Sequence, residues 1–450
     1  MEKEQPKFKI LMFPWLAHGH IFPFLELAKR LSTRNFTIYL CSTPINLDSI
    51  KTSIDQKEYS SFDVKLVELH VPSLPQLPPE MHTTKNLPSN LLPTLLQAFQ
   101  ISTSSFSDIL DSVKPDLLIY DLFQPWAPKI ASSKGIPRVY FCTSGATPCS
   151  FYHHSYTVGT GSPFPYQAIY LRDHEKVNLR NLIAPYIKDA DDDFAFGNFR
   201  LSSDIVLVKS CRDVEGKYID YLSVLSKKRI VSTGPLVVDV NCDDKESWEM
   251  MEWLNGKKQC STVYISFGSE CFLSKEQIAE IAKGLKLSKA NFLWVLRFPI
   301  GEKTSLEEEL PAGFLETVKN RGIVISRWAP QNKILAHPSI GGFVSHCGWS
   351  SITESMYFGV PIIAMPMKFE QPINARLVVE AGVAVEVEKD VNGRFVGEDV
   401  AKAINKVTVE KEFCEVLRDR AKRLSEKIKE NAEQEMNETA EQLLRICLKN

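Results

Sequence analysis

Residues 328–371 read WAPQNKILAHPSIGGFVSHCGWSSITESMYFGVPIIAMPMKFEQ and hold a predicted strand, a sharp turn and a predicted helix in succession. Residues 342–346, which read GFVSH, predict the strand, and residues 350–354, which read SSITE, predict the start of the helix. The turn between them is rich in glycine and hydroxyl side chains. Because the first backbone N–H groups of a helix lack partners and carry partial positive charge, this turn predicts an anion-binding site suited to a phosphate.

Other side chains in this stretch extend the predicted phosphate site. Ser351 can add a hydroxyl donor and His346 a ring N–H, while Glu354 can accept the two hydroxyls of a ribose. The indole of Trp328 offers a flat face on which a base can stack. At the far end, residues 370–371 (Glu-Gln) supply carboxylate oxygens and an amide for sugar hydroxyls. Each of these residues alone is more often structural, but the ordered set predicts a binding site for a nucleoside diphosphate sugar.

The rest of the chain shows apolar strand patterns that alternate with helical patterns. With 450 residues, the chain is suited to two domains of about 200 residues each. Strands that alternate with helices predict parallel, doubly wound sheets, whose ligands bind at the carboxyl ends of the strands. We therefore expect an α/β fold of two Rossmann-like domains that face each other across a cleft. The predicted division is an N-terminal domain (1–236), a linker (237–258), a C-terminal domain (259–425) and a C-terminal helix (426–450) that packs back on the N-terminal domain.

Composition and charge argue against several classes of function. Hydrophobic residues make up 44% of the chain and charged residues 24%, and the net charge of −2 gives no electrostatic basis for binding nucleic acid or an anionic membrane. No apolar run approaches the roughly 18 residues of a membrane span. The ten cysteines are scattered without a CxxC motif, so reduced thiols and a cytoplasmic location are expected. We further expect a monomer.

His20 and Asp121 are the candidate catalytic pair. His20 follows the predicted strand 8–13 and opens the predicted helix 21–32, where the positive end of the helix favours a neutral imidazole that can take a proton. Asp121 follows the predicted strand 117–120. Because the carboxyl ends of parallel strands meet at one edge of a sheet, its carboxylate can hold the imidazole tautomer and stabilise the imidazolium. The two residues therefore predict a general base and its partner.

The ordered set in residues 328–371 resembles the signature box of the plant family 1 UDP-glycosyltransferases. The resemblance implies the two-domain fold called GT-B, with an acceptor-binding N-terminal domain and a UDP-sugar-binding C-terminal domain. One position departs from the family, because Ser350 stands where an asparagine is usual, and this implies a weaker or re-routed contact with the donor. The box residues implied to bind the donor are Trp328, Ala329, Gln331, His346, Gly348, Trp349, Ser350, Ser351, Glu354, Glu370 and Gln371.

Further segments resemble the same family. His20 lies in FPWLAHGHIFPFLELAKRL and Asp121 in LLIYDLFQPWAP, and the resemblance implies for them the roles of general base and partner. Gly268 and Ser269 resemble a phosphate-facing turn, and Thr143 matches a hydroxyl that meets the donor sugar. The implied reaction is an inverting transfer, in which the deprotonated acceptor oxygen attacks the anomeric carbon from the face opposite UDP. The UDP-sugar is then a co-substrate, and neither a metal nor an organic cofactor is expected.

The resemblance also narrows the donor and the acceptor. Gln371 implies UDP-glucose, with rhamnose and xylose left open. Residues 71–91 (VPSLPQLPPEMHTTKNLPSNL) and 120–128 (YDLFQPWAP) resemble the branch that adds sugar to a sugar already on a small molecule. We therefore expect a hydrophobic glycoside acceptor, such as a flavonoid or terpenoid glucoside, extended at its primary 6-hydroxyl to a β-1,6-linked disaccharide. Candidate residues of the acceptor pocket are Phe123, Trp126, Phe151 and Tyr156.

Three other functions are alternatives to glucosyl transfer onto a glycoside. The same fold can glucosylate an aglycone hydroxyl directly. A catalytically inactive UDP-sugar-binding protein belongs to a different class, and Ser350 is the feature that points toward it, whereas the presence of His20 and Asp121 argues against it. A dinucleotide-dependent oxidoreductase shares the sheet type, but the chain lacks a GxGxxG motif after its first strand.

Overall fold

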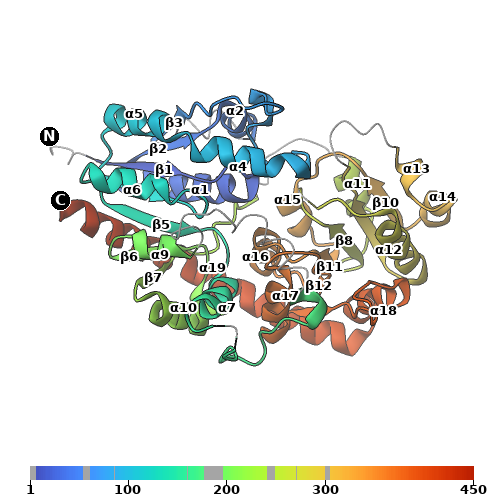
Figure 1. The fold of residues 1–450 in the computed structure, drawn as a ribbon. Helices are drawn as coiled ribbons and strands as arrows, with labels where there is room; N and C mark the ends of the chain where they lie inside the picture. The colour runs from blue at the N-terminus through green and yellow to red at the C-terminus, as the bar shows by residue number, and fades with distance from the viewer. Residues whose placement is uncertain are drawn as a thin grey trace. The chain divides into compact units, whose positions relative to one another are not determined.

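The chain folds as two units, which are described one after the other (Figure 1). Unit 1 comprises Met1–Pro163, Ala184–Leu236 and Asn431–Asn450, and unit 2 comprises Phe164–Ile183 and Val237–Glu430. The computed structural model describes residues 7–53, 61–85, 87–159, 161–176, 196–240, 249–269, 271–298 and 305–449.

The sheet of unit 1 is parallel throughout and reverses its strand order at its centre. Among the described residues it has seven strands in the order β3-β2-β1-β4-β5-β6-β7. The register places Phe13 beside Tyr120, so the chain leaves the two central strands side by side at one edge. A reversal of strand order opens a crevice between the loops at the carboxyl ends, where such sheets bind ligands. The strands are β1 (Phe8–Phe13), β2 (Phe36–Ser42), β3 (Val64–Glu68), β4 (Leu117–Tyr120), β5 (Arg138–Cys142), β6 (Ile205–Val208) and β7 (Arg229–Ser232).

Helices cover the sheet of unit 1 and close its core. Ile10 and Met12 of β1 pack with Phe24 of the first helix and with Met436 and Leu443 of the last. The apolar side chains of β1 therefore pack with two helices that lie far apart in the sequence. The helices are α1 (His18–Ser32), α2 (Pro44–Ser53), η1 (Pro79–Met81), η2 (Ser89–Leu91), α4 (Leu92–Gln100), α5 (Thr103–Val113), α6 (Trp126–Ser133), α7 (Ala146–Thr157), α9 (Gly197–Leu201), α10 (Arg212–Ser226) and the end of α19 (Lys411–Leu448).

The sheet of unit 2 repeats this design. In the part of the chain that the structure describes, it has six parallel strands in the order β10-β9-β8-β11-β12-β13. The order reverses between β8 and β11, where Ser266 lies beside Ser345. The strands are β8 (Thr262–Ser266), β9 (Asn291–Val295), β10 (Gly322–Ile325), β11 (Ile340–Ser345), β12 (Ile362–Ala364) and β13 (Ala384–Glu386). The helices are α11 (Glu249–Asn255), α12 (Lys275–Leu287), α13 (Leu306–Glu309), α14 (Phe314–Val318), α15 (Gln331–Leu335), α16 (Trp349–Phe358), α17 (Gln371–Glu380), α18 (Gly397–Thr408) and the first part of α19.

The division into units differs from the sequence-based one in one segment. The prediction assigned all of residues 1–236 to the first domain, whereas Phe164–Ile183 clusters with unit 2. In its described part, residues 164–176, Glu175 forms a buried ion pair with Arg376 of α17. At the other end, α19 changes units within one continuous helix, after Glu430. No helix among the described residues is long and apolar enough to cross a membrane, and the cytoplasmic location stays a prediction.

Candidate active site

His20 and Asp121 meet at the reversal of strand order in unit 1. His20 is the third residue of α1, which follows β1, and Asp121 follows β4 directly. The ring Nδ1 of His20 lies 2.8 Å from Oδ2 of Asp121. The Asp121 side chain is 1% exposed, whereas that of His20 is 21% exposed. The carboxylate is thus shielded from water, while the imidazole keeps a face that a substrate can reach.

The surroundings of Asp121 fix the protonation pattern of the pair. Its Oδ2 accepts the backbone N–H of Trp15 at 2.9 Å, and its Oδ1 accepts that of Leu122 at 2.7 Å. An aspartate carboxylate can only accept hydrogen bonds, and both of its oxygens do so here. Nδ1 of His20 must therefore donate to it, and Nε2 is the nitrogen that can accept a proton. The hydroxyl of Thr143, after β5, lies 3.0 Å from the same Nδ1.

Two glycines enclose His346 at the reversal of strand order in unit 2. A Cβ atom added to Gly268, which follows β8, would lie 2.9 Å from Cε1 of His346, and one added to Gly348 would lie 2.5 Å from its Nε2. Burial and the nearby charge of Lys368 lower the pKa of His346 to about 4. The ring is therefore neutral at ordinary pH. Its buried Nδ1 has no hydrogen-bond partner among the described residues, so a ligand can meet this polar ring without displacing a protein contact.

The start of α16 offers backbone donors beside His346. Its N-cap residue is Gly348, which has no side chain with which to cap the first N–H groups. The preceding Cys347 has a left-handed φ of 64°, a conformation that costs about 1 kcal/mol or more for a residue with a side chain. The carbonyl of Cys347 accepts a hydrogen bond from Asn374 of α17 at 3.0 Å. The turn is thus held in a strained form that points the helix start at the carboxyl edge of the sheet.

Gln331, the first residue of α15, is hydrogen-bonded to two side chains of α16. Its Nε2 donates to Oε2 of Glu354 at 2.9 Å and to the hydroxyl of Ser351 at 3.2 Å. Its Oε1 accepts from the hydroxyl of Tyr264 on β8 at 3.4 Å. The amide is therefore fixed, and it sets the positions of the two side chains predicted to bind ribose and phosphate. Trp328 lies after β10 with 61% of its surface exposed, as stacking on a base requires.

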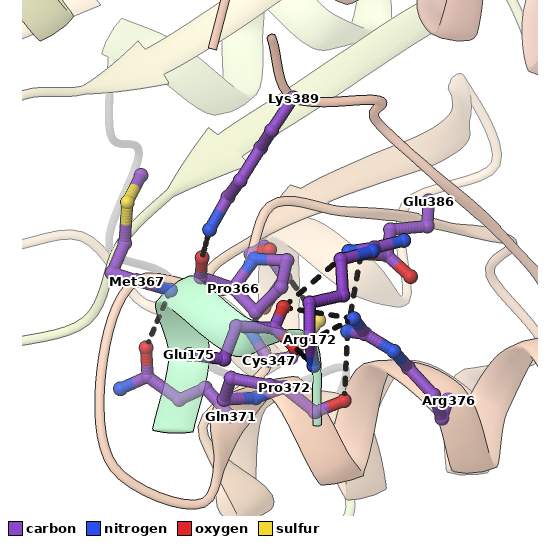
Figure 2. A network of polar contacts seen from close by, with 11 residues as sticks. Arg172, Glu175, Cys347, Pro366, Met367, Gln371, Pro372, Arg376, Glu386 and Lys389 are labelled. Atoms are coloured by element: carbon purple, nitrogen blue, oxygen red, sulfur yellow. Dashed lines mark hydrogen bonds and ion pairs between the residues drawn. The ribbon is translucent and has the colours of Figure 1, made fainter. Parts of the chain in front are cut away.

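The remaining donor candidates fall into two groups. Gln371 is buried, and its Oε1 accepts the N–H groups of Met367 at 3.0 Å and Lys368 at 2.9 Å (Figure 2). Trp349, the first residue of α16, is also buried. Exposed or half-buried side chains, and so open to a ligand, are found at Ala329, Ser350, Glu370 and Ser269.

The acceptor-pocket candidates come from the loop after β4, the start of α6, and α7. The ring of Phe123 lies 5.9 Å from the ring of His20, which makes it a neighbour of the catalytic pair. Trp126 packs in the core against Phe13, Phe99 and Phe106. Phe151 and Tyr156 lie on α7, and Tyr156 is 61% exposed. Their assignment to an acceptor pocket stays a prediction.

Three residues that contribute to the donor site were missed in the sequence. Tyr264 holds Gln331, Asn374 holds the turn at Cys347, and Lys368 lies close enough to lower the pKa of His346. Asn374 was detectable in principle, because it lies one helical turn after Gln371 and so on the same face of α17. The other two lie in segments whose local pattern is that of ordinary strand and loop. No group of three His, Cys, Asp or Glu residues in the described ranges is placed to hold a metal ion.

Comparisons with known proteins agree with this geometry. The family model described as UDP-glucuronosyl and UDP-glucosyl transferase matches residues 45–426. The chain is 47% identical to UDP-glucosyltransferase 29 of Panax ginseng over 100% of this chain and 99% of that one. It is also 47% identical to the β-D-glucosyl crocetin β-1,6-glucosyltransferase of Gardenia jasminoides, over 97% and 98% of the two chains. The crystal structure of a Glycyrrhiza uralensis UGT complexed with glycyrrhetinic acid 3-O-monoglucuronide superposes with a TM-score of 0.82 at 26% identity, covering 98% of this chain and 97% of that one.

Proposed function

Since the chain belongs to the UDP-glucuronosyl and UDP-glucosyl transferase family, we propose that it transfers glucose from UDP-glucose to a small-molecule glycoside and forms a β-1,6-linked disaccharide. The observation that carries the chemistry is the 2.8 Å contact between His20 and a buried Asp121. The acceptor class and the linkage rest on the relatives, among which the Gardenia jasminoides enzyme is named for β-1,6-glucosyl transfer to a glucosyl crocetin. The sequence resemblance to the branch that adds sugar to sugar points the same way.

Residues of unit 1 remove the proton from the acceptor hydroxyl. Nε2 of His20 takes the proton of the attacking hydroxyl while Nδ1 donates to Asp121. The carboxylate stabilises the imidazolium that forms, and the N–H groups of Trp15 and Leu122 hold that carboxylate in place. Thr143 is placed to steady the ring at Nδ1. The acceptor oxygen then attacks the anomeric carbon opposite UDP, so an α-linked donor gives a β-glycoside.

The residues of unit 2 bind the donor and its leaving group. Charge grows on the diphosphate as the glycosidic bond breaks, and preorganised N–H donors are effective where charge develops. The uncapped start of α16, the hydroxyl of Ser351 and the neutral ring of His346 provide such donors. We propose that the reaction uses UDP-glucose as a co-substrate without a metal or organic cofactor, and that the enzyme acts as a monomer.

The test is mass spectrometry with UDP-glucose and paired acceptors, each flavonoid or terpenoid aglycone beside its monoglucoside. We expect the gain of one hexose on the glucosides alone, with NMR of the product showing attachment at the 6-hydroxyl. Gain on the aglycones alone would overturn the acceptor class and keep the chemistry. Gain on neither, with UDP-glucose, UDP-rhamnose or UDP-xylose, would favour a binding protein without catalysis.

His20→Ala is the matched control for this assay. Loss of the base should abolish transfer. Among the described residues, no second histidine is hydrogen-bonded to Asp121 and could replace His20. UDP binding, measured by calorimetry, should stay within about twofold of wild type, since the residues proposed to bind the UDP part of the donor belong to unit 2. A folded His20→Ala protein that no longer binds UDP would contradict this assignment of roles.

A further inference from the structure

Charged side chains from three parts of unit 2 form a network beside Gln371, the residue predicted to bind the donor sugar (Figure 2). Nη2 of Arg376, on α17, lies 2.8 and 2.9 Å from the two carboxylate oxygens of Glu175. Its Nη1 lies 3.1 Å from Glu386, at the end of β13. Arg172 donates to the same Glu386 at 2.7 Å. Arg172 and Glu175 both come from the segment 164–176, which lies some 200 residues before Arg376 in the sequence.

The network is bonded to both ends of the loop that leads into α17. Nη1 of Arg376 donates to the carbonyl of Pro372 at 3.1 Å, in the first turn of that helix. Lys389 donates to the carbonyl of Pro366 at 3.0 Å, where the loop leaves β12. Between these points, Gln371 accepts the two N–H groups of the loop with its Oε1. Figure 2 shows these contacts of the loop beside the cluster of Arg172, Glu175, Arg376 and Glu386.

Because the network is buried, it restricts the position of α17. The side chains of Arg376 and Glu175 are 3% and 2% exposed. Desolvation offsets much of the attraction within such a pair, so the pair adds little net stability, whereas a single unpaired charge left behind is costly. Two arginines and two glutamates balance each other, and burial lowers the pKa of the neighbouring Lys389. The arrangement therefore tolerates one position of α17 and penalises others.

We propose that Glu175 and Arg376 are positioning residues for the donor sugar, and that they set the place of Gln371 through the first turn of α17. Two N–H groups fix the Oε1 of Gln371, so its amide nitrogen is the atom left to donate to a sugar hydroxyl. A shift of the helix start moves that nitrogen together with the adjoining Glu370. This inference rests on the proposed function, because it assigns to the sugar, and not to UDP, the part of the site that the network holds.

The test compares Glu175→Gln with Asp173→Asn, a charge-neutralising change in the same segment. Asp173 is the matched control, because it is fully exposed and pairs only at the surface, with Lys176. We expect Glu175→Gln to raise the KM for UDP-glucose about tenfold and to weaken UDP-glucose binding to a similar degree. Its Kd for UDP, measured by calorimetry, should stay within twofold of wild type. Asp173→Asn should leave all three quantities unchanged.

Each other outcome has a defined meaning. Wild-type KM and binding in Glu175→Gln would overturn the proposal, and so would an equal loss of UDP and UDP-glucose affinity, which indicates general damage to unit 2. If Glu175→Gln does not fold, Arg172→Gln replaces it, because that side chain is 33% exposed and its loss removes the ion pairs that Arg172 makes with Glu175 and Glu386, the two carboxylate partners of Arg376. This variant should raise the KM about threefold without affecting UDP. Wild-type protein that binds UDP-glucose yet transfers to no acceptor would refute the proposed function alone, since the binding comparison can still be made.

Discussion

Replacing Asp121 by asparagine should lower kcat for glucose transfer by roughly 10²- to 10⁴-fold while the protein stays folded. Asparagine keeps the shape of the side chain and one carbonyl oxygen, so one of the two backbone N–H bonds to residue 121 can persist. It carries no charge, however, and its amide nitrogen donates where the carboxylate accepted. His20 then loses both the tautomer that exposes Nε2 as a base and the partner that stabilises its protonated form.

The magnitude follows from the geometry of the pair. At 2.8 Å between Nδ1 and Oδ2, a Coulomb estimate with an effective dielectric constant of about 20 gives roughly 6 kcal/mol as the upper limit. Water screens part of this interaction, because 21% of the His20 side chain is exposed. About 3 to 5 kcal/mol therefore remains, and one factor of ten in rate corresponds to about 1.36 kcal/mol.

The assay is the initial rate of glucoside glucosylation at saturating UDP-glucose and acceptor. Asp116→Asn is the control, because Asp116 precedes the same strand β4 and accepts a backbone N–H from Lys9 of β1 at 2.7 Å, but contacts no histidine in the described structure. The control should keep wild-type kcat. A folded Asp121→Asn enzyme with kcat within threefold of wild type would refute the assignment of Asp121. It would also refute the inference that two residues at neighbouring strand ends form a general base and its partner.

Three further changes test other parts of the molecule. Gln331→Leu should weaken UDP binding about tenfold in calorimetry, because the amide that fixes the ribose and phosphate side chains is lost. Gly348→Ala should weaken it at least as much, since its Cβ would lie 2.5 Å from His346, whereas Gly216→Ala, with nothing within 4 Å, should not. Burial raises the pKa of Glu435 from 4.5 to about 7, so the stability this group contributes is lost as pH rises through that window. Glu435→Gln should therefore match wild type in urea unfolding at pH 4 and exceed it by up to about 3 kcal/mol at pH 8, and equal stability at both values would contradict the buried-carboxyl account.

Local chemistry made the donor turn predictable. The expected strand at residues 342–346 is β11 (Ile340–Ser345), and the expected helix start is that of α16 (Trp349–Phe358). Apolar residues before a glycine, with hydroxyl residues after it, determine a strand, a turn and a helix within a few positions of one another. What this pattern did not reveal is the strain at Cys347, because its positive φ depends on the hydrogen bond from Asn374 in another helix.

The catalytic pair was predictable for a different reason. His20 and Asp121 are 101 residues apart, and two strands, β2 and β3, lie between their strands in the sequence. The pairing follows from a general property of doubly wound sheets, in which the first strand lies at the reversal of strand order and its neighbour there comes later in the chain. The role of Thr143 was harder to place, because a hydroxyl after a strand gives no sign of which group it will meet.

The place of segment 164–176 in unit 2 could not be predicted from the sequence. A buried ion pair such as Glu175–Arg376 leaves no local pattern, since an isolated glutamate in a loop is normally solvated. A domain exchange at residue 237, where the sequence places the linker, would give unit 2 of this chain a foreign segment in place of residues 164–176. Arg376 would then keep Glu386 of its own unit but lose the carboxylate of Glu175, and the loss of one partner from a buried pair costs several kcal/mol in comparable cases. Exchanges intended to transfer donor preference should therefore carry residues 164–176 together with the C-terminal part of the chain, because that segment belongs to the unit that we propose binds the donor.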